Sequence, residues 1–188
     1  MTDVFTDRSI TEKFAQLKAW GAGEFAHLNG TLEAHLKGTY ELLRSWKANL
    51  TLCDAGLFHA AYGTDGFDEH LLSLDNRAKI ADIIGEEAEQ IVYLYCSCDR
   101  SYVFENIRPN HPVQFHNRFT DQYFELTEEQ GCDFYLLTVA NELEIAAQST
   151  AFVSQHGEAL RALFANMTQY LPASATDMVE SVLGEASR

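Results

Sequence analysis

"AHLKGTYELLRSWKANLTLCDAGLFHA", residues 34–60, contains two helical patterns in direct succession. Apolar side chains at steps of three or four form one stripe of the first pattern, which begins just before the quoted stretch: Leu32, Leu36, Tyr40, Leu43 and Trp46. Such a stripe is typical of an amphipathic helix, and His35 falls beside it. The second pattern, "TLCDAGLFHA", is a short apolar run that we interpret as a buried helix ending near His59. The stretch therefore predicts two consecutive helices, each with one histidine.

Helical patterns also dominate the rest of the chain. From Ile10 to Trp20 apolar residues recur at three-residue steps until two glycines stop the pattern. The segment "SLDNRAKIADIIGEEAEQIVYLYCSCDRS" predicts two helices that meet at Gly85. Thr127 and Gln130 have the form of a capping box, which predicts that a long helix begins there.

Residues 99–125 are the main interruption of this periodicity. Two prolines and alternating aromatic residues predict a long ordered loop here, with room for a short hairpin. Two more amphipathic helices are expected at 156–170 and 176–183, and there is no internal repeat or evident linker. We therefore predict an all-α fold, a compact bundle of about seven to nine helices, in a single domain over residues 1–188.

The charge of the chain narrows the choice of partners. It has 188 residues, with 13 Lys and Arg against 28 Asp and Glu, which gives a formal net charge of -15. Such a surface repels phosphate backbones and anionic lipids, so we expect neither a nucleic-acid nor a membrane partner. A small-molecule ligand, even a phosphorylated one, stays compatible, because a metal or a few arginines can reverse the field locally.

The sequence also indicates a compartment. No segment is long and apolar enough to span a bilayer, and the start "MTDVFTDRSITEKF" lacks the pattern of a signal peptide. The four cysteines do not have the spacing of a zinc knuckle, and we expect them to be reduced. These features predict a cytoplasmic protein and leave open whether it forms a homo-oligomer.

Three histidines are the candidate metal ligands. His27 and His35 would be roughly 12 Å apart on one helix, too far for one metal, but Gly23 and an Asn-Gly pair suggest that His27 precedes the helix. From there it could fold back towards His35. Together with His59 they form a reasonable ligand set for Fe, Mn or Zn. The competing interpretation is that each histidine is a hydrogen-bonded core residue.

Other polar residues interrupt apolar segments and extend this candidate pocket. The turn "YGTDGF" offers Tyr62, Thr64 and Asp65, and its glycines would let a ligand approach the backbone, although they also make ordinary turns. Asn141 lies inside the capped helix, where its amide needs a partner.

Arginines could orient an anionic group. Arg77 lies in the helix before Gly85, and Arg100 follows a buried helix beside Asp99. Either could bind a carboxylate or phosphate in bidentate fashion, or form an internal ion pair. His111 and His116 in the loop are further candidates, since their segment could form a lid or a surface turn.

At this point the chain resembles the HD superfamily of helical metal-dependent phosphohydrolases and related oxygenases. The quoted stretch resembles the opening of those enzymes, in which one histidine begins a helix and a His-Asp pair ends the next. "RAKIADIIGEEAEQIVYLY" is similar to the following segment of the stringent-response nucleotide hydrolases, and "LLTVANELE" is similar to the helix with the last aspartate ligand. The likeness covers about residues 30–147 and leaves 148–188 as a helical C-terminal extension; similar phrases occur in a small HD-like family of uncharacterised proteins.

The resemblance assigns roles and also shows two departures. It implies that His35 is the first histidine ligand and His59 the histidine of the pair. Ala60 stands where the paired aspartate belongs, and Asn141 stands in place of the last aspartate. Both anionic ligands of the family's metal are therefore missing, which argues against an ordinary phosphohydrolase mechanism.

Three interpretations fit this pattern: a rebuilt site with His27, His35 and His59 as metal ligands, a metal-free small-molecule pocket, and a relic that serves as an interaction scaffold. The leading hypothesis is a metal-dependent enzyme, of hydrolase or oxygenase type, that acts on a small polar metabolite. In it Asp65 is the general base and Arg77 orients an anionic group, with Tyr62, Thr64 and Asn141 in the pocket. The alternative is a non-catalytic small-molecule-binding or protein-interaction module.

Overall fold

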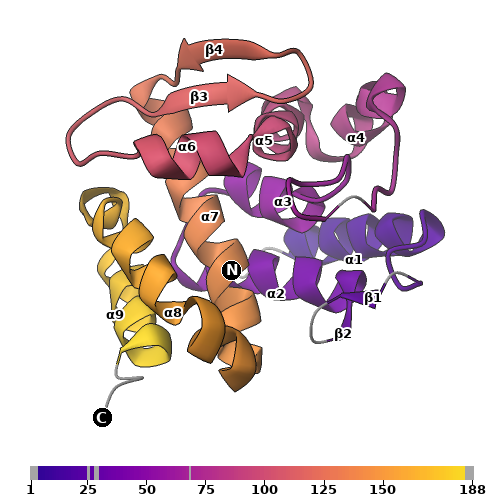
Figure 1. The fold of residues 1–188 in the computed structure, drawn as a ribbon. Coiled ribbons are helices and arrows are strands. Elements are labelled where there is room, and N and C mark those ends of the chain that lie inside the picture. The colour runs from indigo at the N-terminus through magenta and orange to yellow at the C-terminus, as the bar shows by residue number, and fades with distance from the viewer. Residues whose placement is uncertain (1–3, 25, 28–29, 68, 185–188) are drawn as a thin grey trace.

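The computed structural model describes residues 4–24, 26–27, 30–67 and 69–184, and it describes no side chain of residues 4–9 or 26–27. Within these ranges the chain forms nine α-helices and two small two-stranded antiparallel sheets (Figure 1). The helices are α1 (Val4–Ala19), α2 (Leu32–Ser45), α3 (Leu50–Phe58), α4 (Arg77–Ile84), α5 (Glu86–Ser97), α6 (Arg100–Asn106), α7 (Glu128–Gln148), α8 (Thr150–Ala165) and α9 (Ala173–Leu183), and the strands are β1 (Ala26–His27), β2 (Gly30–Thr31), β3 (Gln114–Asn117) and β4 (Gln122–Glu125). The expected all-α fold is confirmed.

The two helices expected in residues 34–60 are α2 and α3, and side chains cap both. Thr31 accepts a hydrogen bond from Ala34 N at 3.2 Å, and Asn49 accepts one from Leu52 N at 2.7 Å. These bonds satisfy backbone N–H groups that have no partner inside the helix. The predicted apolar stripe of α2 is its buried face, and nearly all of α3 is buried between α2 and α5. Each histidine therefore sits at a packed interface between helices.

Helix α7 is the central element of the fold (Figure 1). It begins at the expected capping box: Thr127 Oγ1 accepts from Gln130 N at 3.2 Å, and Gln130 Oε1 accepts from Thr127 N at 3.0 Å. Its 21 residues pack against α2 on one side and against α8 and α9 on another. Because α7 is buried over most of its length, the polar residues in its middle need partners inside the protein.

The segment 99–125 contains more regular structure than the loop expected from its sequence. Helix α6 begins at once because Asp99 Oδ1 caps it by accepting from Tyr102 N at 3.0 Å. The two prolines lie in the connection between α6 and β3, and strands β3 and β4 then form a hairpin in which Phe115 pairs with Phe124. The expectation of a long loop was thus wrong for α6, since one short cap outweighs the missing periodicity.

Several helix boundaries also differ from the sequence pattern. The C-terminal helices begin earlier than the expected 156 and 176, at Thr150 and Ala173. Ser149 explains the first shift, because its hydroxyl accepts from Phe152 N at 3.1 Å. Helices α4 and α5 meet at Gly85 as expected, where φ is +88°, a conformation that glycine adopts without strain. No helix in the described ranges is long and apolar enough to cross a membrane.

Candidate functional site

Helices α2 and α7 and the end of α3 bring His35, His59 and Asn141 together. His35 Nε2 lies 3.2 Å from His59 Nε2 and 3.0 Å from Asn141 Oδ1. The three side chains are almost completely buried, with exposed fractions of 4%, 1% and 4%. Residues separated by more than 100 positions in the chain thus form one compact cluster, which we call the histidine cluster.

The opposite side of each of these groups makes a hydrogen bond that fixes its orientation. His35 Nδ1 donates to Glu144 Oε2, and His59 Nδ1 donates to Gly56 O at 2.7 Å. A carbonyl oxygen cannot donate, so the proton of a neutral His59 is on Nδ1. Asn141 Nδ2 donates to Glu142 Oε1 at 2.9 Å, which turns its amide oxygen towards His35. In neutral imidazoles these bonds leave lone pairs on the three atoms that face one another.

Glu144 is held in place by its surroundings. Its Oε1 accepts from Gln148 Nε2, and its side chain occupies the space next to Gly38 of α2. A Cβ atom at Gly38 would lie 2.7 Å from the Cγ and Oε1 atoms of Glu144, too close for any real contact. The glycine inside α2 therefore has a packing reason: it makes room for the carboxylate that orients His35.

The histidine cluster forms one wall of a pocket of about 330 Å³. The pocket is lined by His35, His59, Ala60, Thr64, Asp65, Gly66, Phe67, Arg100, Asn141, Glu142, Ile145 and Phe152. This volume is at the lower end of the range typical of small-molecule sites, roughly 300–1,000 Å³. Of the residues expected in the pocket from sequence, His35, His59, Thr64, Asp65 and Asn141 all line it.

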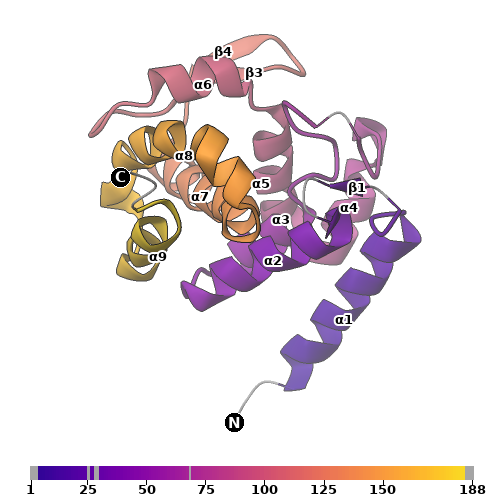
Figure 2. The same ribbon diagram turned by 60° about the horizontal axis from the view of Figure 1, so that its bottom comes forward.

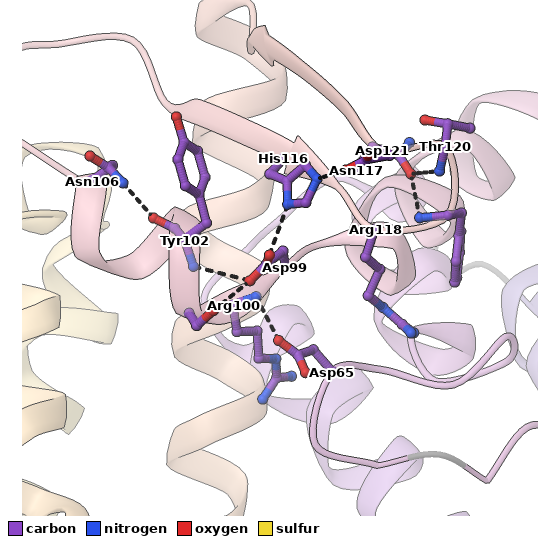
Figure 3. Close-up of polar contacts among 12 residues, drawn as sticks. Asp65, Asp99, Arg100, Tyr102, Asn106, His116, Asn117, Arg118, Thr120 and Asp121 are labelled. Carbon is purple, nitrogen blue, oxygen red and sulfur yellow. Dashed lines mark hydrogen bonds and ion pairs between the residues drawn. The ribbon is translucent and has the colours of Figure 1, made fainter.

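Arg100 is the cation of this pocket, and its neighbours fix its position. Its Nη1 donates to Glu142 Oε1 at 3.1 Å, and its Nη2 donates to the Tyr95 hydroxyl at 3.3 Å. Burial by itself would lower the pKa of Arg100, but Tyr95, Glu142 and other acidic groups outweigh it, so the pKa is raised and the charge is kept. Asp65 Oδ2 accepts from the backbone N of Arg100 at 2.8 Å (Figure 3).

Another histidine, His116, lies close by but outside the pocket. His116 of β3 donates from Nδ1 to Asp99 Oδ2 at 2.8 Å and from Nε2 to Asp121 Oδ1 at 2.9 Å (Figure 3). These two carboxylates, Asp99 first, raise the pKa of His116. The Tyr102 backbone N–H, the Ser101 hydroxyl and His116 lower the pKa of Asp99 to about 2. This group ties the hairpin to the start of α6 and so helps to position Arg100.

Two of the expected pocket residues lie elsewhere. Arg77 donates to both carboxylate oxygens of Glu89, at 2.7 and 2.6 Å, and stacks on Tyr93 with its guanidinium carbon 3.8 Å from the ring centre. The Tyr62 hydroxyl donates to the same Glu89 at 2.7 Å. Neither residue lines the pocket, so the structure gives Arg77 the internal ion pair that was the alternative at the sequence level.

The remaining candidate histidines have separate locations. The side chain of His27 lies outside the described part of the chain, so its expected role as a ligand stays a prediction. His111 lines a different pocket, between the loop before β3 and the start of α7. Among the described residues no group of three or more His, Cys, Asp or Glu side chains is placed to hold a metal ion. The third oxygen or nitrogen donor of the histidine cluster is instead the amide oxygen of Asn141.

Two residues that shape the site, Glu142 and Glu144, are not among the candidates from the sequence. Glu142 and Glu144 stand out in the sequence only as charges beside Asn141 in an apolar helix. In the structure Glu142 accepts hydrogen bonds from both Arg100 and Asn141 and so fixes their positions. Glu144 accepts one from His35 and so orients its ring. The available signal was their position: carboxylates in the middle of a helix that is otherwise buried must be paired.

Part of the chain matches a known family model. A family model described as "Domain of unknown function (DUF6817)" matches residues 16–100. The match therefore includes His35, His59 and Asp65 and ends at Arg100, while Asn141, Glu142 and Glu144 lie beyond it. No curated protein and no solved structure matches the chain.

Proposed function

We propose that the pocket is the active site of a metal-dependent hydrolase of HD-like type that acts on a small polar metabolite. The observation that carries the proposal is the convergence of two imidazole nitrogens and one amide oxygen at 3.0–3.2 Å. Two ligands of one metal, each about 2.1 Å from it, lie roughly 3.0 Å apart at a right angle and roughly 3.4 Å apart at a tetrahedral angle. The spacing in the cluster fits that range.

The chemistry of the three donors supports the same proposal. When both imidazoles are neutral, the three facing atoms are all acceptors, and a metal cation could bind them in place of the hydrogen bonds that link them. Imidazole nitrogens suit Zn and Fe, and Mn also accepts the amide oxygen. Glu144 behind His35 and the Gly56 carbonyl behind His59 are the hydrogen-bond partners that metal-bound histidines usually have. The residues present therefore fit a metal of the kind that the HD resemblance implies, with the Asn141 amide in place of one carboxylate and Ala60, which supplies no ligand, in place of the other.

The other residues of the pocket have roles that follow from their positions. A bound divalent metal would polarise a substrate oxygen and lower the pKa of water. Asp65 is the general base, because its carboxylate lines the pocket and is held in place by the hydrogen bond that its Oδ2 accepts from the backbone N of Arg100. Arg100, whose charge is retained, binds a negatively charged group of the substrate in the role first given to Arg77.

We place the protein in the cytoplasm, in keeping with its four free cysteines.

One experiment with three variants tests this function. Protein purified without a metal-affinity tag is analysed for Zn, Fe and Mn and assayed for hydrolysis of p-nitrophenyl phosphate and p-nitrophenyl acetate. We expect near-stoichiometric metal in the wild type, loss of metal in His59→Ala, and normal metal in the control His111→Ala. Asp65→Asn should keep the metal and lose about 10²–10⁴-fold in turnover.

Different outcomes separate the proposal from its alternative. Metal-free wild-type protein that does not take up added metal would rule out the metal site. Bound metal without turnover that depends on Asp65 would instead favour a non-catalytic small-molecule-binding module. Equal loss of metal in His59→Ala and His111→Ala would show that the ion binds outside the histidine cluster.

A further inference from the structure

An apolar groove between α6 and α8 adjoins the pocket. Its volume is about 660 Å³, and its apolar walls are Phe104, Phe152, Ala159, Leu160, Ala162 and Leu163. The groove and the pocket share Arg100, Glu142 and Phe152, so these three residues mark the junction between them. In the view of Figure 2, helix α6 lies above helix α8. A molecule that enters the pocket with one end therefore has an apolar surface next to it.

The walls of the groove are open to a ligand. Ala159 and Ala162 are exposed, and Phe104, Phe152 and Leu163 are only partly buried. Helix α8 belongs to the C-terminal part of the chain, beyond both the matched residues 16–100 and the region that resembles HD enzymes. The groove is thus a feature that this extension adds to the pocket.

The combined space has charged and polar side chains in the pocket and at the junction, and an apolar surface along α8. Two imidazoles and Arg100 line the pocket together with the carboxylates of Asp65 and Glu142, and Arg100 donates to Glu142. An acidic head at this end therefore needs the positive charge of the metal ion that the proposed function would place at the histidine cluster. The groove is apolar along α8, with Glu105, Arg108 and His156 among its remaining lining residues. Pockets for small molecules usually combine apolar walls with a few polar groups that fix one end of the ligand.

We infer that the molecule bound here is an acidic amphiphile, either a phosphate monoester substrate or the carboxylate product of ester hydrolysis. Its oxygen-rich head lies at the histidine cluster and Arg100, and its alkyl or aryl chain lies in the α6–α8 groove. This inference rests on the proposed function for the position of the head. Transfer of each methylene group from water to an apolar wall strengthens binding about fourfold. The chain therefore supplies most of the affinity and the head supplies the orientation.

A series of simple probes tests the inference by isothermal titration calorimetry. Acetate, butyrate, octanoate and octyl phosphate are titrated into the full-length protein. We expect acetate to bind weakly, and the affinity to rise by about fourfold for each added methylene up to octanoate. Octyl phosphate against octanoate then decides which acidic head the site prefers. Equal affinity for acetate and octanoate would overturn the inference.

A matched pair of variants locates the chain of the probe. Ala159→Trp fills the groove from an exposed position, and Ala165→Trp changes an exposed alanine of the same helix that does not line the groove. We expect Ala159→Trp to weaken octanoate binding at least about tenfold and to leave acetate binding unchanged, while Ala165→Trp leaves both unchanged. Equal weakening by the two variants would place octanoate elsewhere and overturn the inference.

The same titrations separate this inference from the proposed function. Metal content is measured in Ala159→Trp and should equal that of the wild type, because the groove does not contribute to the histidine cluster. If the wild type holds no metal but octanoate binding depends on chain length and on Ala159, the groove is confirmed and only the metal chemistry fails. If metal is present but chain length has no effect, the proposed function stands and the amphiphile is excluded.

Discussion

The buried His35 and the hairpin residue His116 both donate from Nδ1 to a carboxylate, yet their Nε2 atoms face different kinds of partner. His116 Nε2 meets another carboxylate, that of Asp121. His35 Nε2 meets an imidazole nitrogen and an amide oxygen. Two carboxylates stabilise an imidazolium ion at His116, whereas Nε2 of His35 faces neutral acceptors, with which it can form hydrogen bonds or, in the proposed function, share a metal ion. A carboxylate next to a histidine is therefore not enough to distinguish a structural ion pair from a candidate metal ligand. The groups that face the second ring nitrogen make that distinction.

The largest expected effect comes from removing the carboxylate behind His35. Glu144→Met keeps the length of the side chain but leaves the His35 Nδ1–H and the Gln148 amide without this partner. We expect about 10–100-fold weaker metal binding and a loss of about 1–3 kcal/mol in the free energy of unfolding. Metal titration and urea denaturation measure the two effects.

The control is the corresponding change at the other histidine. Asp121→Met removes one carboxylate of His116 from an exposed position and should leave metal binding unchanged, since His116 does not line the pocket. Equal metal affinities of the two variants would remove the distinction between the two histidines.

A smaller effect is expected when Glu144 is displaced rather than replaced. Gly38→Ala improves the intrinsic helix propensity of α2 by about 1 kcal/mol, but its Cβ collides with the Glu144 side chain. We expect the effect of the collision to exceed the gain in helix propensity. Metal binding should become about tenfold weaker, and the free energy of unfolding should not increase. Gly157→Ala in α8 is the matched control, because its Cβ meets only Val153 Cγ1, at 3.2 Å. A Gly38→Ala variant that is more stable and binds metal normally would contradict the role given to Glu144.

The smallest effect concerns the pH dependence of the His116 ion pairs. The pKa of His116 is raised in the folded state, so its stabilising contribution is complete below the unfolded value of about 6.5 and is lost as the pH rises through the folded value. We expect a small decrease in melting temperature over that interval, absent in His116→Phe. The NMR titration of the His116 ring should give a pKa above 6.5 that falls more in Asp99→Asn than in Asp121→Asn. A pKa at or below 6.5 would show that the two carboxylates do not hold an imidazolium ion.

Prediction from sequence succeeded where the determining interactions are local. The stripe of α2, the Thr127 capping box and the junction at Gly85 depend on residues within a few positions, and each appears in the structure as expected. Helix α6 was missed although its cause is equally local, because a cap at Asp99 is a weaker signal than the prolines that follow it. The pocket was predicted in part, since His35 and His59 end up together while Arg77 pairs with Glu89.

The sequence by itself determined the helices, their caps and the types of residue available for a site. Only the tertiary structure decided which polar residues meet, because the crossing of α2, α3 and α7 sets contacts between residues more than 100 positions apart. The packing places Arg100 rather than Arg77 in the pocket and pairs Glu144 with His35. It also brings α8 next to the site, where it forms a wall of the groove. Helical periodicity specifies which face of a helix is buried, but the partner of each buried polar group depends on how the helices pack.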